Sequence, residues 1–211
     1  PRVRRQRQMC IRDRFFSMGW QYDKDAIMSV IKPYESGSPI NLMSYDNFSH
    51  ISKYNVVLSL SQKIKRWSPR LRLNLLGQDF DIPTMNGIRN MNTPILFWNF
   101  YNTINLGKGF NLTADLMGRT QGDMDVVTLK PSWQLNIGMT KNLNNWFFQL
   151  QATDVFKTAR NSMITYGEQM TLNKWNYSDT QAIRLIVRYS FNATMNKYKG
   201  KSAGTFERSR L

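Results

Sequence analysis

The sequence predicts an all-β fold, in which about eight long strands form an antiparallel up-and-down meander, a partial transmembrane β-barrel. Three observations predict this class. Apolar and polar residues alternate along most of the 211 residues, at the two-residue period of a strand with one apolar face. Neither a convincing helical stripe nor a repeat of solenoid length interrupts that pattern. Short turns and long polar links also alternate along the chain, as they do between the strands of transmembrane barrels.

The individual strands follow from the alternation. In residues 70–75, for example, three leucines alternate with two arginines and an asparagine. Pro131 interrupts another alternating stretch, so we expect an irregularity or bulge there. Residues 40–62 allow an alternative of two strands, because residues 50–53 can form a turn. The predicted strands are 15–31, 40–62, 69–79, 94–105, 110–119, 126–139, 146–156 and 181–191.

The connections between these strands fall into two classes of length. The short turns are 63–68, 106–109 and 140–145, and the long polar links are 32–39, 80–93, 120–125 and 157–180. Because successive strands run in opposite directions, all short turns fall on one side of the sheet and all long links on the other. Outer-membrane barrels show this rhythm, with short periplasmic turns and longer outer loops.

The last predicted strand shows the two faces expected of a barrel strand, one toward lipid and one toward the lumen. In residues 183–191 apolar side chains occupy every second position, and Arg184 and Arg188 lie between them. An arginine on the lipid face near mid-bilayer costs roughly 2–4 kcal/mol, whereas one facing a lumen costs little. We therefore expect Arg184 and Arg188, with Arg70 and Arg72, to face the lumen. One half-buried strand of a soluble protein shows the same alternation, so the prediction depends on six or more such strands.

Large aromatic residues gather at the short-turn side of the predicted sheet. Trp67, Phe110 and Trp146 each follow a short turn, and Tyr189 and Phe191 close the last strand on the same side. Transmembrane barrels carry aromatic girdles at their interfaces with water. We therefore predict an interface girdle from these five residues, although aromatic residues also begin strands in soluble sandwiches.

The charge of the chain is concentrated at its two ends. The formal net charge is +15, which suggests a nucleic-acid binder. Residues 1–14 carry +5 and residues 192–211 carry +4, which leaves +6 for the 177 residues between them, without a basic stripe. We expect no nucleic-acid partner. The charge argument for a basic nucleic-acid binder weakens once residues 1–14 are removed from the count.

Three regions follow from composition. Residues 1–14, which include the single cysteine Cys10, resemble translated adapter sequence and are expected to be non-native or disordered, with a real basic arm as the alternative. Residues 15–191 are expected to form the C-terminal part of the barrel, and residues 192–211 a polar basic tail. One cysteine excludes a disulfide framework. No apolar run reaches the ~18 residues of a membrane helix.

Motifs for catalysis or metal binding are weak. The single histidine, His50, has no evident nucleophile partner in a recognisable motif. Asp123 and Asp125 resemble calcium ligands, but two carboxylates without further ligand spacing more often form a solvated turn. Asp154 is expected to make a buried structural hydrogen bond. We therefore predict no enzyme, no catalytic residue, no cofactor and no metal.

The longest outer link carries the best candidates for contact with a solute. Residues 157–180 contain Tyr166, Trp175 and Tyr177 among asparagine, glutamine and threonine residues. Aromatic rings beside amides suit stacking and hydrogen bonding to a polar solute. The alternative is a loop that packs on itself.

Three stretches resemble the outer-membrane β-barrel family related to TonB-dependent receptors. Residues 149–160, QLQATDVFKTAR, are similar to a late strand with an Asp-x-Phe motif, and WQYDKDAI at 20–27 is similar to an earlier strand. Residues 187–211, VRYSFNATMNKYKGKSAGTFERSRL, resemble the end of the family, a Tyr-x-Phe-Asn strand followed by a basic tail. The resemblance covers 15–211, the last third of a barrel that in this family usually has 22 strands.

The resemblance implies a function and several partners. It implies the cell outer membrane of a Gram-negative organism, contact with outer-membrane lipid, and a missing N-terminal plug and barrel half. It implies TonB-dependent uptake of a siderophore, oligosaccharide or peptide, and recognition of the last strand, with Tyr189 and Phe191, by the barrel-assembly machinery. Twenty residues follow Phe191, which departs from the commoner pattern of a terminal aromatic residue. The rival hypothesis is a soluble, secreted β-sandwich or barrel that acts as a binding module.

Overall fold

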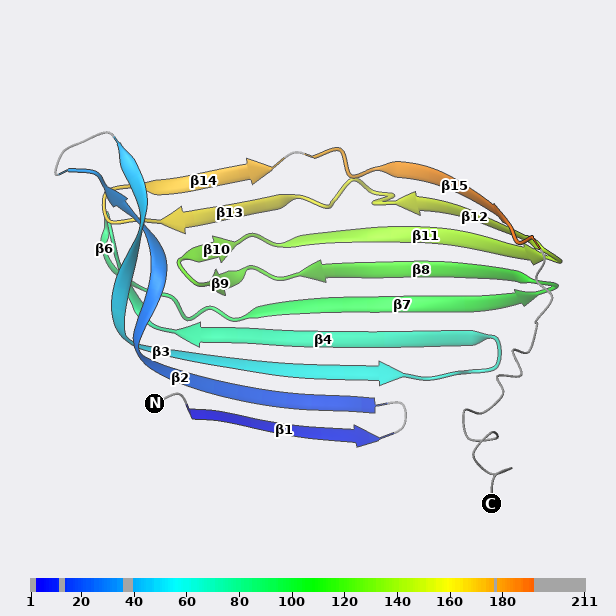
Figure 1. Cartoon of the computed structure of the whole chain (residues 1–211), viewed down its shortest axis with the longest axis horizontal. Helices are drawn as coiled ribbons and strands as arrows, with labels where there is room; N and C mark the ends of the chain where they lie inside the picture. The colour runs from blue at the N-terminus through cyan, green and yellow to red at the C-terminus, as the bar shows by residue number, and fades with distance from the viewer. Residues whose placement is uncertain (1–2, 12–13, 36–39, 177, 192–211) are drawn as a thin grey trace, which may run out of the picture.

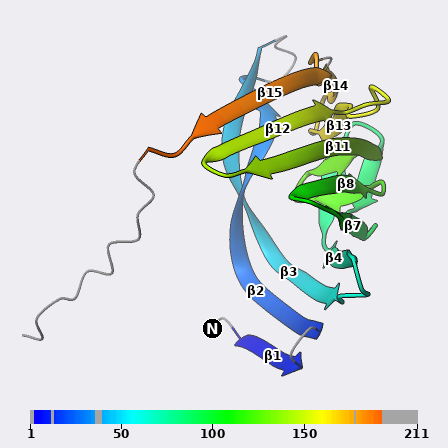
Figure 2. The same ribbon diagram turned by 90° about the vertical axis from the view of Figure 1, so that its right-hand side faces the viewer.

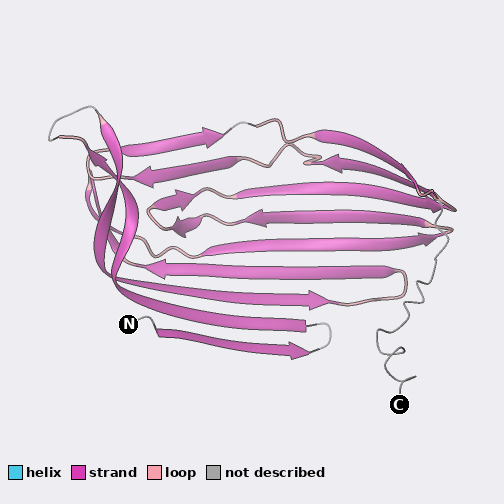
Figure 3. Ribbon diagram, in the orientation of Figure 1, coloured by secondary structure: helices cyan, strands magenta, loops and turns pink. Residues whose placement is uncertain are grey.

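The structure is a computed structural model that describes residues 3–11, 14–35, 40–176 and 178–191. Every regular element in this part of the chain is a β-strand, and Figure 3 shows no helix among the described residues. No helix in these ranges is long and apolar enough to cross a membrane.

The principal sheet is an open antiparallel meander of nine strands (Figure 1). Each strand pairs with its neighbours in chain order, apart from the small outer elements that are inserted between them, which confirms the predicted meander. The two edge strands, β1 and β15, do not pair with each other, and Figure 2 shows the sheet as an arc. In sheet order the strands are β1 (Val3–Ile11), β2 (Arg14–Pro33), β3 (Asn41–Ser61), β4 (Trp67–Asp79), β7 (Ile95–Gly107), β8 (Phe110–Arg119), β11 (Ser132–Leu143), β12 (Trp146–Thr153) and β15 (Ala182–Tyr189).

The N-terminal segment differs from the expectation of disorder. Val3–Ile11 forms β1, which pairs with β2 from Val3 opposite Tyr22 to Ile11 opposite Arg14. The physical reason is that pairing joins backbone groups, so an arginine-rich segment beside the otherwise free edge of β2 satisfies that edge despite its composition. Its foreign origin stays a prediction.

The three short turns lie together at one end of the sheet, at the right of Figure 1. Each contains a residue with positive φ, which lets the chain reverse within a few residues. These residues are Lys65 (φ 54°), Lys108 (φ 49°) and Asn144 (φ 51°). The alternative turn at 50–53 is wrong, because β3 runs unbroken from Asn41 to Ser61.

Three of the long links, 80–93, 120–125 and 157–180, were expected to be polar loops but contain short strands, and the start of the predicted strand 126–139 forms a separate short strand. β5 (Asp81–Thr84) and β6 (Gly87–Asn90) form a hairpin, and β9 (Gly122–Met124), β10 (Val127–Leu129), β13 (Asn161–Tyr166) and β14 (Thr171–Asn176) form a second sheet. The irregularity expected at Pro131 is confirmed, because β10 ends at Leu129 and β11 begins at Ser132. Proline has no backbone N–H to donate to a strand pair.

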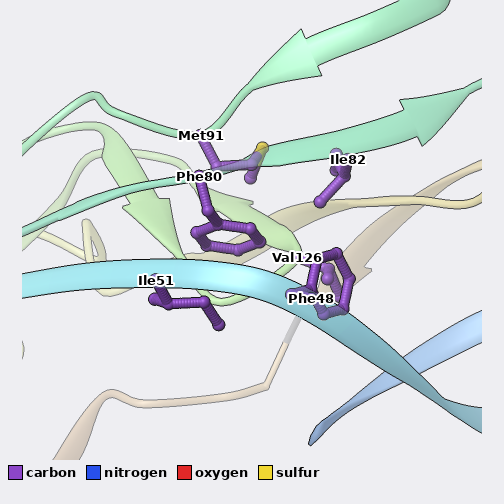
Figure 4. Close-up of a cluster of buried hydrophobic side chains, with 6 residues drawn as sticks. All are labelled: Phe48, Ile51, Phe80, Ile82, Met91 and Val126. Atoms are coloured by element: carbon purple, nitrogen blue, oxygen red, sulfur yellow. The ribbon is translucent and has the colours of Figure 1, made fainter. Parts of the chain in front are cut away.

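The β2–β3 hairpin is about twice as long as a bilayer requires, and its outer half crosses the mouth of the arc (Figures 1 and 2). Near the crossing Asp25 has φ 51° and no register partner. Beyond it, one face of the hairpin covers the main buried cluster of the described chain (Figure 4). The cluster consists of Phe48, Ile51, Phe80, Ile82, Met91 and Val126. The core therefore lies at the outer end and not between two sheets.

Candidate membrane-facing surface and outer-loop site

Strand register sorts the side chains of the meander into two chemically different faces. Directly paired residues lie on one face of a sheet, so a row can be followed from strand to strand. One row on the apolar face is Ile104, Leu112, Met139, Leu150 and Leu185. Four residues further along the strands, another apolar row is Leu60, Leu71, Phe100, Leu116 and Leu135.

The opposite face carries the four predicted arginines. Arg72 lies in a row with Asn99, Met117 and Gln134, and Arg70 in a row with Tyr101, Asp115 and Asn136. Arg184 pairs with Gln151, and Arg188 lies over the ring of Phe147 at 5.4 Å. The alternation therefore keeps one register across eight strands, from β2 to β15, which a chance pattern in one strand does not do.

The polar face is the concave face of the arc. On this face the side-chain amide of Gln78 accepts a hydrogen bond from the backbone N–H of Asp125 at 2.8 Å and donates one to its carbonyl at 2.9 Å. Lys53 reaches the carboxylate of the same Asp125 at 2.7 Å. Asp125 lies between β9 and β10, which extend β8 and β11, three and four places from β3 in the sheet. A contact between such distant parts of an arc runs along its concave side.

The five aromatic residues of the predicted girdle all lie at the short-turn end, and we call them the inner aromatic row. Trp146 and Tyr189 are register partners with ring centroids 4.7 Å apart, and Phe191 packs edge-on against Tyr189 at 4.6 Å. Lys141 Nζ lies 3.9 Å from the ring of Phe110. Trp67 Nε1 donates a hydrogen bond to Asn102. All five are exposed, as rings in contact with lipid and headgroups are. Their role at a membrane interface stays a prediction.

A second aromatic row, which we call the outer aromatic row, lies at the other end of the apolar face and was missed from the sequence. It consists of Trp20, Tyr54, Trp98, Trp133 and Phe156. Two glycines make room for it: a Cβ on Gly77 would lie 2.0 Å from Tyr54, and a Cβ on Gly118 would lie 2.6 Å from Trp98. The spacing of aromatic residues in the sequence could have located this row, because Phe156 lies ten residues after Trp146. That interval matches the 9–11 residues of a spanning strand.

Beyond the outer row, a polar cluster joins the outer hairpins, and we call it the outer clamp. It consists of Arg89, Thr93, Asp123, Thr128 and Tyr166. The buried Asp123 carboxylate accepts hydrogen bonds from Thr128 at 2.5 Å and from the backbone of Thr93 at 3.0 Å, with Arg89 at 3.7 Å. The Arg89 guanidinium lies 4.3 Å from the ring of Tyr166. The clamp therefore connects β6, β9, β10 and β13.

A second buried carboxylate, Asp154, lies beyond the end of β12 and outside the spanning strands. Burial raises its pKa, but hydrogen bonds from the Thr180 hydroxyl, the backbone and hydroxyl of Thr158 and the backbone of Ala159 prevail and lower the pKa below its ordinary value. This confirms the expected structural hydrogen bond. The carboxylate fixes the chain on both sides of the β13–β14 hairpin.

The family of the protein follows from a sequence comparison. The model of the outer membrane protein beta-barrel family matches residues 12–192. The chain belongs to this family. Neither a curated protein nor a solved structure matches it. The family places this outer-membrane protein in the cell outer membrane, so the rival hypothesis of a soluble secreted module is wrong.

In this outer-membrane protein two of the three predicted solute-contacting residues are described, and they lie at opposite ends of the β13–β14 hairpin. Tyr166 is half-buried and engaged in the outer clamp. Trp175 is 68% exposed and lies at the other end of the β13–β14 hairpin, opposite Ser162. Tyr177 lies outside the described residues. Contact of these residues with a solute stays a prediction.

The two carboxylates considered for calcium have separate partners. Asp123 belongs to the outer clamp, whereas Asp125 forms an ion pair with Lys53. His50 is exposed and lies beside Ser49 and Tyr22, with its Nδ1 3.0 Å from the Ser49 hydroxyl. Within the described ranges no group of three potential metal ligands is present.

Arg89→Leu is expected to loosen the β5–β6 hairpin, because the buried Asp123 carboxylate loses its cation. The expected loss of stability is about 1–3 kcal/mol, the cost of removing one partner of a buried charged group. Limited proteolysis of the folded barrel at the exposed Met85 and Ile88 measures it. Arg89→Lys, which keeps the charge, should remain close to the parent, and equal cleavage of Arg89→Leu and the parent contradicts the prediction.

Acidification is expected to release the β13–β14 hairpin through Asp154. Because the folded pKa of Asp154 is below the unfolded value of about 3.9, its contribution is complete above that pH and is lost as the pH falls through the folded pKa. Hydrogen-exchange protection of the Thr158 and Ala159 amides measures the loss. Asp154→Asn should lower protection already at neutral pH. Protection that is equal in both proteins at every pH contradicts the role of the carboxylate.

Proposed function

We propose that this chain forms part of a receptor or transporter barrel that takes up a bulky nutrient across the outer membrane, energised by a TonB-type transducer. The observation that carries the proposal is the polar, arginine-bearing concave face of a sheet whose two edges do not meet. An eight-stranded barrel closes on an interior that its side chains fill. A wider barrel leaves a lumen that is filled with water or with a plug, and arginines fit such a lumen.

The resemblance of residues 149–160 and 187–211 to barrels related to TonB-dependent receptors supports the energised form of this transport. The resemblance also implies that a plug and further barrel strands are partners of this chain. A passive pore would share the polar lumen but not the coupling to a transducer. The prediction that the protein is not an enzyme is part of the same proposal.

Uptake by the intact, unsubstituted protein that contains this chain, which we call the parent protein, tests this function. Cells that express it are supplied with a labelled siderophore complex, oligosaccharide or peptide, with and without the transducer. We expect uptake of one class, lost when the transducer is removed. Equal influx with and without the transducer means a passive pore, and the absence of uptake of all three classes rejects the proposal.

Phe191→Ser in the parent protein is expected to impair insertion into the membrane. Phe191 is 83% exposed, and its described ring contact is with Tyr189, so its loss removes an interface ring without creating a cavity. The measurement is heat-modifiable migration of the membrane fraction on gels, with uptake scored per folded barrel. Normal folded yield rules out the assembly role, and normal yield with lost uptake places Phe191 in transport instead.

A further inference from the structure

A cavity of about 380 Å³ lies on the concave face between the barrel wall and the β9–β10 turn. β2, β3 and β4 supply its wall, and Asp123, Met124 and Asp125 cover one side. Its volume is within the range of small-molecule sites and equals about a dozen waters in liquid volume. It lies at the outer end of the lumen, where a solute from outside arrives first.

The covering turn is fixed by named contacts. Gln78 makes two hydrogen bonds to the backbone of Asp125, at 2.8 and 2.9 Å, and is itself buried. The outer clamp holds Asp123, two residues earlier, in β9. The cavity is therefore bounded by a supported turn and by a sheet, and it does not depend on a free loop end.

The charges that line the cavity compensate one another. The Lys53 ammonium lies 2.7 Å from the Asp125 carboxylate, and Asp123 faces Arg89 and Thr128 in the outer clamp. What remains for a ligand is uncharged hydrogen-bonding capacity, chiefly the amide of Asn55 and the amide oxygen of Gln21, whose Nε2 donates a hydrogen bond to the Asp23 carboxylate. The side chain of Asn55 extends across Gly19, where a Cβ would lie only 2.3 Å from its Oδ1.

We propose that this cavity binds an uncharged segment of the solute that is rich in hydroxyl or amide groups. This rests on the proposed function and selects among its solute classes. A multiply charged anion would lose hydration without gaining an unpaired cation, because Lys53 is already paired with Asp125. The arginines of the concave face do not line the cavity, and Arg72 lies six residues along β4 from Gln78.

Titration calorimetry on the intact parent protein in detergent tests the proposal with three probes. They are a neutral trisaccharide, a neutral tetrapeptide with blocked ends, and a trianionic ferric catecholate. We expect the trisaccharide or the peptide to bind, and which of the two binds identifies the source of the shared chemistry. Binding of the ferric complex alone, or of none of the three probes, overturns the proposal.

Two leucine substitutions remove the amides and nearly keep the volume. Gln21→Leu with Asn55→Leu should weaken binding of the neutral probe at least tenfold, since two hydrogen bonds are lost. Met18→Leu with Val56→Leu is the matched control on the same strands, because these register partners lie on the apolar face. Equal affinities of the two double variants overturn the proposal.

Asp125→Asn tests the charge argument in the opposite direction. Removing the carboxylate leaves Lys53 unpaired, so affinity for the ferric complex should rise while binding of the neutral probe changes little. An unchanged affinity for the anion overturns the argument from charge compensation.

Failure of this cavity can be distinguished from failure of the proposed function. If the parent protein shows energised uptake but Gln21→Leu with Asn55→Leu binds the neutral probe as the parent does, the function stands and the cavity assignment fails. Calorimetry in detergent needs no transducer, so it tests the cavity even where uptake fails.

Discussion

Leu150→Arg is expected to lower the free energy of unfolding from a lipid bilayer by about 2–4 kcal/mol, because it puts a charge on the lipid face near mid-height. Leu150 is 47% exposed and lies between Met139 and Leu185 in an apolar row. It follows the inner-row residue Trp146 by four residues and precedes the outer-row residue Phe156 by six. Reversible denaturant unfolding in vesicles measures the loss.

Gln149→Arg is the matched control for this prediction. Gln149 is the residue of β12 before Leu150 and pairs with Thr140 and Ile186 on the concave face. An arginine there meets the lumen, so we expect a change of less than about 0.5 kcal/mol. If Leu150→Arg and Gln149→Arg lower the free energy of unfolding equally, the two faces of β12 do not lie in different environments. The assignment of the apolar face to lipid would then be wrong.

Gly118→Val is expected to destabilise the barrel by about 3 kcal/mol, the upper end of the range for overpacking. Gly118 lies in the outer aromatic row between Trp98 and Trp133. A Cβ there would lie 2.6 Å from Trp98 Cζ2, 2.7 Å from the Ser132 carbonyl oxygen and 2.8 Å from Trp133 Cβ. The same vesicle unfolding measures the loss.

Two further variants separate crowding from other effects at Gly118. Ala114→Val lies on the same strand and the same face, in register with Asn102 and Ile137, and is expected to be nearly neutral. Adding Trp98→Leu to Gly118→Val should restore only part of the stability, because the clash with the backbone of Ser132 remains. Full stability of Gly118→Val contradicts the argument that the glycine makes room for the aromatic row.

The wall of the barrel was predictable from the sequence because each of its strands satisfies a local rule. Alternation in 183–191 and 70–75 assigned the faces without knowledge of any partner strand. Lys108 and Asn144 lie in turns whose shortness marked one end of the sheet. The register between strands then follows, since a slip of one residue would put arginines on the apolar face.

The outer end was less predictable because its structure depends on contacts between distant segments. The 80–93 link looked like a polar loop, although it contains the β5–β6 hairpin and supplies Phe80, Ile82 and Met91 to the core. Nothing local to Tyr166 indicates that Arg89 lies over its ring. The cavity needs β2, β3, β4 and the β9–β10 turn together, so no single motif contains it.

The unequal lengths of the hairpins have a mechanical consequence. β2 and β3 share nineteen register pairs, whereas β12 and β15 share eight. When a force pulls the chain out of the membrane from its C-terminus, it loads these ladders of paired residues one after another, beginning with β15. The β12–β15 ladder then separates first and in a short step, and the β2–β3 hairpin gives the longest extension. The force reaches β3 at Ser61, so the inner half of this hairpin separates first and the outer half, which covers the core cluster, separates second. The force–extension record of this hairpin therefore contains two events.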